Sequence, residues 1–328
     1  MGEAPETFLR GQLQQRRTRL ESALGQFGQA GQLVQLLQEV DSALQRMDQG
    51  TYGLCEKCHE SVEADRLMAD PLVRFCIDHL TTEQQRALEQ DLELASRIQA
   101  SLLPKRHLAQ DGWELHYHYE PLGPVSGDYV DVLTSGDDGG DLFFLLGDVV
   151  GKGVAASMLM AHIHATFRTL INLHRRVDQL VEQANRLFSE STLASFFATL
   201  VCGKAGRSGE IELCNAGHCS PLLVRGAKVE TIEPTGLPIG LFSNSQYSAR
   251  RILLGKGETL FLFTDGLTEA RTHASEEYGE SRLAELLAAR HNLPPQALAE
   301  ACLEDVKVFL AGAPRTDDLT VMVLRHQA

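Results

Sequence analysis

The first fifty residues carry apolar side chains at helical spacings, separated by polar residues. Leucines from Leu9 to Leu24 recur at intervals of four or seven, and a second apolar stripe runs from Leu33 to Met47. This periodicity predicts helices over residues 7–24 and 33–47, with a glycine-rich tip between them. The two helices could form a hairpin. They could instead pair with another chain, because short isolated helices are marginally stable in water.

A second helical pattern covers residues 80–104 and stops at Pro104. Its apolar positions include Leu88, Leu92, Ala95 and Leu102. The stripe is wider than the narrow seam of a coiled coil, so it favours a helix that packs on its own domain, dimerises, or does both.

From Trp113 onward, short apolar runs alternate with turns and with longer amphipathic stretches. The run at residues 142–146 indicates a strand buried on both faces. Other strands are expected near residues 198–202, 210–214 and 222–224. Helices are expected over residues 154–173, 179–187, 281–289 and 297–310. This part of the chain is therefore a mixture of strands and helices.

The composition narrows the possible classes of protein. A chain of 328 residues has room for two or three domains, at about 100–200 residues each. A net charge of −14 argues against binding to nucleic acid or to an anionic membrane over the whole surface. No signal peptide is visible, and no apolar run reaches the about 18 residues of a membrane span. The seven cysteines do not form a secreted disulfide pattern, so a cytoplasmic location is expected.

Three of these cysteines belong to a metal-binding pattern. The spacing is Cys55-x2-Cys58, then 17 residues, then Cys76-x2-His79. Paired thiolates with imidazole suit tetrahedral Zn²⁺, and four protein ligands leave no open position for catalysis. His59 is an alternative fourth ligand. The pattern predicts one structural zinc ion, and the symmetry of the two pairs favours His79.

Acidic residues follow or precede several of the expected strands. They are Asp128, Asp148, Asp265 and the pair Asp317–Asp318. A buried charge is costly unless it is paired or bound to metal, and neighbouring carboxylates repel one another. Oxygen ligands select hard cations such as Mg²⁺ or Mn²⁺. Several such acids in one domain therefore indicate a divalent-metal site, although a single Asp-Gly turn would not.

The segments that contain these acids resemble the SpoIIE/RsbU-type metal-dependent protein phosphatases, which are relatives of the type-2C enzymes. The similarity begins near Leu92, continues to the C-terminus and includes residues 127–131, 147–153, 215–222, 236–241, 264–270 and 317–321. It implies an α+β fold, a four-layer α/β/β/α sandwich. It also implies a protein-serine/threonine phosphatase in which two Mn²⁺ or Mg²⁺ ions activate water.

The resemblance assigns roles to individual residues. Asp128 and Asp148 are expected to contact both metals, with the carbonyl of Val149 completing one coordination shell. Asp265 is expected to bind one ion. The expected catalytic set is Asp128, Asp148, Asp265 and Asp317.

The remaining positions near the acids have alternative or supporting roles. The motif favours Asp317 as a ligand, but Asp318 is an alternative. Asp131, His218 and Lys152 are expected to support the site rather than to bind metal. The cysteines in this part of the chain, Cys202, Cys214 and Cys219, are interpreted as buried thiols and not as nucleophiles.

Residues 49–80 resemble the zinc finger of the DksA/TraR family, with His79 where that family usually has cysteine. The tip at residues 25–32 lacks the acidic residues with which that family acts on RNA polymerase. Residues 92–104, L-E-L-A-S-R-I-Q-A-S-L-L-P, resemble the linker that precedes SpoIIE/RsbU-type phosphatase domains. That linker implies control of dimerisation and activity.

These readings predict four parts: a helical hairpin (1–50), a zinc finger (51–80), a linker helix (81–104) and a phosphatase domain (105–328). The expected function is hydrolysis of phosphoserine or phosphothreonine on a regulatory protein, such as an anti-sigma-factor antagonist. The zinc module and the linker would control it, in a homodimer without membrane or direct nucleic-acid binding. The alternative is a DksA-like regulator that binds RNA polymerase and uses the phosphatase domain as a scaffold.

Overall fold

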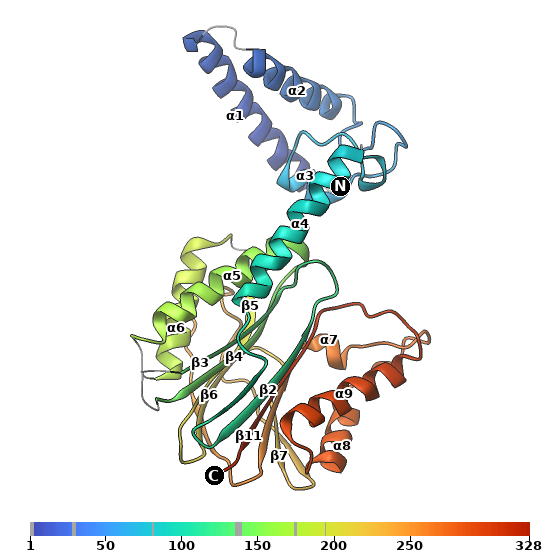
Figure 1. Cartoon of the computed structure of the whole chain (residues 1–328). Helices are drawn as coiled ribbons and strands as arrows, with labels where there is room; N and C mark the ends of the chain where they lie inside the picture. The colour runs from blue at the N-terminus through green and yellow to red at the C-terminus, as the bar shows by residue number, and fades with distance from the viewer. Residues whose placement is uncertain (1–2, 28–30, 81, 135–139, 174–175, 194) are drawn as a thin grey trace. The chain divides into compact units, whose positions relative to one another are not determined.

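The computed structural model describes residues 3–27, 31–80, 82–134, 140–173, 176–193 and 195–328 (Figure 1). The chain divides into two compact units, Met1–Gln90 and Asp91–Ala328. The boundary lies inside helix α4 (Thr82–Leu102), which ends two residues before Pro104 as the sequence predicts.

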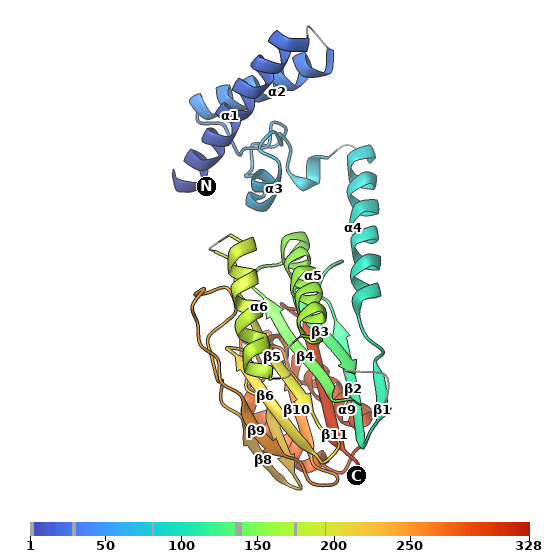
Figure 2. The ribbon, with the colours of Figure 1, turned by 90° about the vertical axis from the view of Figure 1, so that its left-hand side faces the viewer.

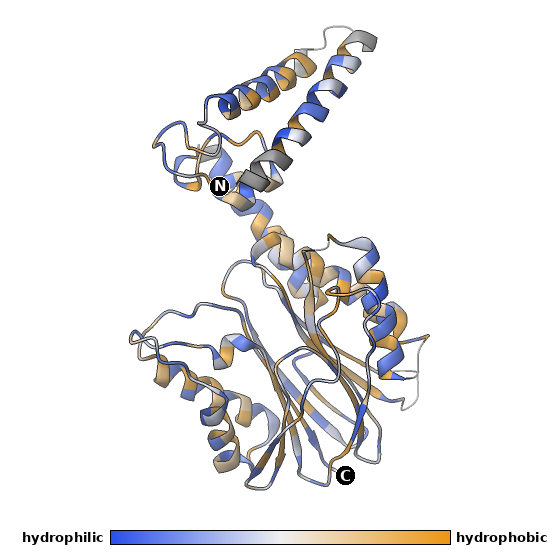
Figure 3. Cartoon of the chain, turned by 180° about the vertical axis from the view of Figure 1, so that it is seen from behind, coloured by the Kyte–Doolittle hydropathy of each residue, from blue (hydrophilic) through white to orange (hydrophobic). Residues whose placement is uncertain are grey.

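The first unit contains the helical hairpin and the zinc-finger segment. Its helices are α1 (Glu3–Phe27), α2 (Gly31–Asp48), α3 (Ala64–Ala69) and the short 3-10 helix η1 (Ile77–His79). One apolar cluster joins α1, α2 and α3, and it includes Leu9 and Leu13 of α1, Val40 and Met47 of α2, and Leu67 of α3. The helix pair predicted from the sequence is therefore confirmed as a hairpin within one chain. Apolar and polar residues alternate along α2 in Figure 3, as expected for a helix with one buried face.

The second unit is built on two antiparallel sheets. The first sheet has the strand order β1 (His107–Gln110), β2 (Trp113–Glu120), β11 (Leu319–His326), β10 (Thr259–Phe263), β7 (Leu222–Arg225) and β8 (Lys228–Thr231). The second has the order β3 (Asp128–Thr134), β4 (Leu142–Val149), β5 (Ala198–Ala205), β6 (Glu210–Ala216) and β9 (Arg250–Leu253).

The alternation of side chains along each strand produces the layers. On β4, Phe144 and Leu146 join the core between the sheets, whereas Phe143 and Leu145 face α5 (Gly153–Leu170) and α6 (Val177–Ser191). Figure 2 shows these two helices over the second sheet. Helices α8 (Glu280–Arg290) and α9 (Pro295–Leu310) cover the other sheet through a third apolar cluster. The predicted four-layer α/β/β/α arrangement is confirmed.

Strand direction brings the acidic segments to one end of this sandwich. Strand β3 begins at Asp128, and β4 reaches Asp148 just before it ends. On the other sheet, β10 ends directly before Thr264, and β11 begins directly after Asp318. Residues 121–127 connect β2 with β3 and so carry the chain from one sheet to the other at this end.

In the described part of the chain, none of the helices combines the length and the apolar content that crossing a membrane requires.

Candidate active site

Asp128 and Asp148 lie opposite each other on neighbouring antiparallel strands, β3 and β4. Residues paired in this way project from the same face of a sheet, with Cβ atoms about 5 Å apart. Both share the face of Leu146, which points into the core between the sheets. Asp128 is only 2% exposed, and Asp148 is partly exposed.

Two threonines from the opposite sheet hold the Asp128 carboxylate. Thr264 Oγ1 donates to Asp128 Oδ2 at 3.1 Å, and Thr320 Oγ1 donates to the same oxygen. Both threonines are fully buried. They are also joined to each other, because the Thr320 N–H donates to Thr264 Oγ1 at 3.0 Å. These bonds attach β3 to the ends of β10 and β11 and fix one oxygen of the carboxylate.

Asp265 and Asp317 lie in segments next to strands β10 and β11 of the first sheet. Asp265 begins the short helix α7 (Asp265–Thr268), and Asp317 lies two residues before β11. The two segments touch at Gly266, where an added Cβ would lie 1.9 Å from the Asp318 carbonyl oxygen and 3.3 Å from Asp317 Cβ. A residue with a side chain could not occupy this position without moving the backbone of the acidic segment.

The pKa values show that these acids form one electrostatic group. Burial raises the pKa of Asp128 well above its ordinary value, and the negative charge of Asp148 raises it further. Burial also raises the pKa of Asp148 to about 7, assisted by the charges of the acids on the other sheet. The pKa of Asp265 is raised by burial and then by Asp317. The group can be fully ionised at neutral pH only if a cation neutralises it.

The residues around these acids fit a hard divalent cation. Gly127 packs closely against two of the candidate ligand oxygens, since an added Cβ would lie 2.9 Å from the Val149 carbonyl oxygen and 3.1 Å from Asp148 Oδ1. A cation is already drawn to the site, because Lys152 Nζ donates to Asp317 Oδ2 at 2.9 Å. All of the candidate metal-ligand atoms are oxygens, which Mg²⁺ and Mn²⁺ prefer.

The four aspartates are more widely spaced than the zinc ligands. Among the described residues, only the cysteine–histidine cluster has three or more possible ligand atoms that all lie within 4.8 Å of one another. Mg²⁺ usually keeps several waters and takes only one or two carboxylates in a site. Carboxylates spaced in this way suit ions of that kind.

Asp317 and Asp318 are adjacent, but they have different partners. Asp318 accepts three hydrogen bonds from the loop before β3: from Leu122 N at 2.6 Å, Ser126 Oγ at 2.7 Å and Gly127 N at 3.1 Å. Asp317 Oδ1 accepts only from the Asp318 N–H, and Asp317 Oδ2 accepts from Lys152. Asp318 therefore anchors the loop, and Asp317 is the better candidate for a metal ligand.

Asp131 is not part of the acidic group, and the expectation that it supports that group is wrong. It lies on the opposite face of β3, fully buried, where Arg168 of α5 donates to Oδ1 at 2.8 Å and to Oδ2 at 2.9 Å. His164 Nδ1 lies 3.5 Å from Oδ2. Asp131 is three residues from Asp128, and an odd separation along a strand places two side chains on opposite faces. Its role is to attach α5 to the sheet.

His218 lies behind Asp148 and is 5% exposed. Its Nδ1 shares a hydrogen bond of 2.8 Å with Thr199 Oγ1, and Thr199 is paired with Asp148 across β4 and β5. The His218 N–H also donates to Asn215 Oδ1 at 2.8 Å. Burial lowers the pKa of His218 to about 4, so the imidazole is neutral at pH 7. This placement suits a residue that shapes the loop and supports β5.

The structure adds residues that the sequence reading did not identify, namely Thr199, Thr264, Thr320, Ser126 and Gln99. Two of them had a recognisable signal. Thr264 and Thr320 interrupt continuous apolar runs at strand ends, where a buried hydroxyl requires a partner.

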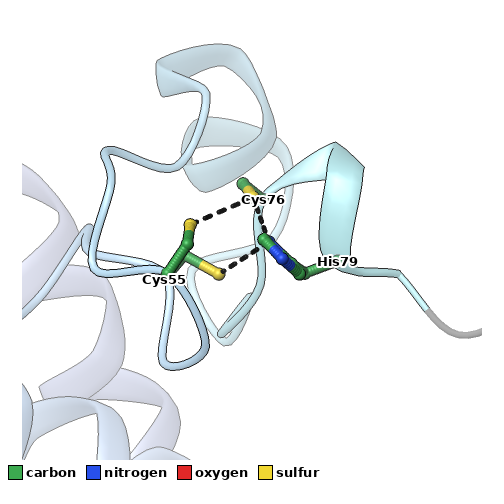
Figure 4. A group of neighbouring side chains, drawn as sticks. Cys55, Cys76 and His79 are labelled. Carbon is green, nitrogen blue, oxygen red and sulfur yellow. Dashed lines mark hydrogen bonds between the residues drawn. The ribbon is translucent and has the colours of Figure 1, made fainter.

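The predicted zinc ligands converge in the first unit. Cys55, Cys58, Cys76 and His79 form the cluster within 4.8 Å, and Figure 4 shows Cys55, Cys76 and His79 directed toward one another. Cys58 Sγ lies 3.8 Å from Cys76 Sγ, and Cys55 Sγ lies 3.7 Å from His79 Nδ1. Tetrahedral zinc with Zn–S bonds of about 2.3 Å gives sulfur–sulfur separations of about 3.8 Å. His59, the alternative ligand, is not in this cluster.

We predict that Asp148→Asn changes the pH dependence of stability. Between about pH 4 and pH 7 the folded wild type holds a proton on Asp148 that the unfolded chain has released. Its free energy of unfolding therefore falls as pH rises through this window. Without added Mn²⁺ or Mg²⁺, the variant should melt higher than wild type at pH 7.5 by about 2–4 °C, which corresponds to about 1 kcal/mol.

Calorimetry of the thermal unfolding of the second unit from pH 4.5 to 8 measures this effect. Zinc is left bound to the first unit. Asp111→Asn, in the turn between β1 and β2, is the control and should follow wild type. Equal pH slopes for wild type and Asp148→Asn would show that Asp148 does not carry the proton.

We also predict that Cys55→Ser lowers the zinc content by one ion per chain and destabilises the first unit. Removing a ligand from a closed zinc site removes binding energy that contributes to folding. Elemental analysis and circular dichroism measure the two effects. Cys219→Ser, a thiol in the second unit, should leave the zinc content unchanged. If Cys55→Ser retains all of its zinc, the cysteines are not ligands.

Comparison with known proteins agrees with this geometry. Residues 138–327 match the family model "Stage II sporulation protein E (SpoIIE)", and residues 50–78 match "Prokaryotic dksA/traR C4-type zinc finger". The chain is 25% identical over 247 residues to phosphoserine phosphatase RsbU of Bacillus subtilis, an alignment that covers 74% of this chain and 72% of RsbU.

Protein IcfG of Synechocystis is 26% identical over 263 residues, covering 71% of this chain but only 41% of IcfG. Among solved structures, the SiaA-PP2C domain of Pseudomonas aeruginosa superposes with a TM-score of 0.65 at 22% identity, covering 74% of this chain and 98% of that domain. At this identity, the likeness to the SiaA-PP2C domain concerns the fold alone. The chain belongs to the SpoIIE family of PP2C-type phosphatase domains and carries an N-terminal zinc finger of the DksA/TraR type.

Proposed function

We propose that this protein hydrolyses phosphoserine or phosphothreonine on a regulatory protein and uses a water activated by divalent metal. The observation that carries the proposal is the meeting of Asp128 and Asp148 with Asp265 and Asp317 at one end of the two sheets. Burial, together with neighbouring negative charges, raises the pKa values of Asp128, Asp148 and Asp265, which supports a site that cations neutralise. Membership of the SpoIIE family supports the same chemistry.

Each acid has a defined support. The two threonine hydroxyls fix Asp128, and the pairing of β3 with β4 places Asp148 beside it. Helix α7 presents Asp265, and Asp317 is steadied by the N–H of Asp318. Divalent cations held by these oxygens would lower the pKa of a bound water and neutralise charge on the phosphoryl oxygens. The acids therefore position the water and phosphate for in-line attack.

The chain's own nucleophile candidates argue for attack by water. Burial raises the pKa of Cys202 well above its ordinary value and raises those of Cys214 and Cys219 to about 12. These thiols are therefore not thiolates at neutral pH. His218 is neutral at pH 7 and only 5% exposed, so it is not a charged acid at the open side of the site.

A phosphorylated protein is the substrate that suits the position of the site. The Asp317 side chain is 42% exposed, so the outer edge of the acidic group is open to solvent. A phosphorylated side chain on a folded protein can reach such a surface site. The relative RsbU is named a phosphoserine phosphatase, and we propose an anti-sigma-factor antagonist as the class of substrate.

Helix α4 is the proposed route of control. The Gln99 side chain is 6% exposed and pairs with the backbone of Ser126: Gln99 Nε2 donates to Ser126 O at 2.7 Å, and Ser126 N donates to Gln99 Oε1 at 3.0 Å. The Ser126 hydroxyl then donates to Asp318 and accepts from the N–H of Asp128. Displacement of α4 would therefore disturb the loop that carries Asp128.

The zinc finger is the proposed input to this helix. Glu56, between two of the zinc-binding cysteines, accepts hydrogen bonds from Arg46 of α2 at 3.1 Å and from Arg74 at 2.6 Å. The segment that carries Cys55 and Cys58 is therefore attached to α2 of the helical hairpin.

The exposed side of α4 suits a homodimer. Leu94 and Ile98 are 51% and 56% exposed and lie one helical turn apart. A second copy of the chain would cover both. A monomeric mass by light scattering at working concentration would remove this part of the proposal.

The catalytic proposal predicts that the purified chain with Mn²⁺ releases phosphate from phosphoserine proteins. Asp265→Asn should lower kcat by at least about 100-fold, because it removes a metal ligand without changing the shape of the side chain. Asp111→Asn, at the other end of the sandwich, should keep wild-type activity. A wild-type protein that binds Mn²⁺ and hydrolyses no phosphoserine or phosphothreonine substrate would refute the catalytic proposal.

The control proposal predicts that Gln99→Ala lowers kcat by about tenfold without changing the mass of the oligomer, because two buried hydrogen bonds to the loop are lost. Glu93→Ala, on the exposed side of the same helix, should have little effect on kcat. Equal kcat values for the Gln99 and Glu93 variants would show that α4 does not act through the loop.

A further inference from the structure

Lys152 lies directly after the acidic strand β4 and its glycine turn, at the residue before α5. Its ammonium donates to the Thr316 carbonyl oxygen at 2.7 Å and to Asp317 Oδ2 at 2.9 Å. The Lys152 side chain is 61% exposed, so the ammonium reaches the site from solvent. The ion pair between Lys152 and Asp317 is easily broken, because an exposed ion pair contributes little to stability.

The same Asp317 oxygen is the one available for metal. Asp317 Oδ1 is occupied by the N–H of Asp318 on the side of β11. Lys152 and a divalent cation would therefore compete for Oδ2. A divalent ion carries twice the charge of the ammonium and would displace it.

The balance of charge gives the displaced ammonium a second partner. The four carboxylates of the site carry four negative charges, which two divalent cations would cancel. A phosphate dianion that enters such a neutral site gains from one further positive charge nearby.

Two other basic residues of the second unit, Arg315 and Arg168, already have acidic partners. Arg315 donates to the carbonyl oxygens of Glu120 and Pro121 and pairs with the Glu120 carboxylate at 3.0 Å. Arg168 is bonded to Asp131 on the far face of β3. Lys152 differs from these arginines in two ways. Its partner Asp317 is a candidate metal ligand, and its side chain is exposed enough to move.

We propose that Lys152 has two alternative partners: it holds Asp317 when no metal is bound there, and it binds the substrate's phosphate once a divalent cation takes Asp317. The lysine is thus a phosphate-binding residue that also competes with the metal. This inference rests on the proposed phosphatase function for its substrate, but its two binding effects can be measured without turnover.

The test compares Lys152→Met, which keeps a long unbranched side chain without charge, with wild type and Lys152→Arg. The matched control is Lys256→Met, an exposed lysine in the turn before β10. Calorimetric titration of the full zinc-loaded chain with Mn²⁺ measures metal affinity. Titration of the Mn²⁺-loaded chain with inorganic phosphate measures phosphate affinity.

Lys152→Met should bind Mn²⁺ about two- to fivefold more tightly, because the competing ion pair is gone. It should bind phosphate about tenfold more weakly, because a charge-assisted hydrogen bond is lost. Lys152→Arg should retain phosphate affinity within about threefold of wild type. Lys256→Met should match wild type in both titrations.

Unchanged Mn²⁺ and phosphate affinities in Lys152→Met would overturn the proposal, and so would weaker Mn²⁺ binding. Loss of phosphate affinity in Lys152→Arg equal to that in Lys152→Met would also count against it, because both residues are cations. If wild type binds Mn²⁺ and phosphate with the expected lysine dependence but hydrolyses no phosphoprotein, the proposed function fails and the role of Lys152 stands.

Discussion

Repulsion between carboxylates is the constraint on which the functional end of the sandwich depends. Asp128 and Asp148 are paired across β3 and β4, and the first sheet adds Asp265 and Asp317 to the same end. Such a group is unfavourable in any fold that does not supply compensating charge or hydrogen bonds. The surrounding residues supply both. Buried hydroxyls bond one oxygen of Asp128, and a lysine pairs with Asp317.

The first unit meets a different constraint, with a cluster of cysteine and histidine side chains instead of carboxylates. It is small, and its apolar cluster is shared among a hairpin, one short helix and the knuckles that contain Cys55 and Cys76. Small domains bury too little surface for stability from packing alone. A closed cysteine–histidine site can supply the missing folding energy because all of its ligands come from the protein. The acidic site of the second unit is built of oxygens and is open at Asp317. The two sites therefore differ in ligand chemistry and in access, which fits a structural role for one and a catalytic role for the other.

The sequence was informative where a local rule decides the structure. A continuous apolar run located β4, helical spacing located the hairpin, and acids at strand ends indicated the place where chemistry is concentrated. Asp131 was misread because it lies in the same short motif as Asp128, and only the strand alternation separates their faces. Thr320 and Gln99 could not be assigned from the sequence. Thr320 acts on Asp128 across 192 positions, and Gln99 reaches a loop 27 positions away. Such contacts depend on how sheets and helices meet, and no local pattern encodes that.

The two adjacent acids before β11, Asp317 and Asp318, have different partners. Asp318 is saturated by three donors from the loop before β3, so moving it would release that loop. Asp317 keeps one oxygen toward the site, where Lys152 now holds it. A shift of helix α4 would reach Asp318 first, through Gln99 and Ser126, and would reach Asp317 through the backbone they share. In the proposed mechanism, control of the loop and control of the proposed metal-binding oxygen would therefore be coupled by one peptide bond. That coupling would allow α4, which bonds to Ser126, to influence whether the site is complete.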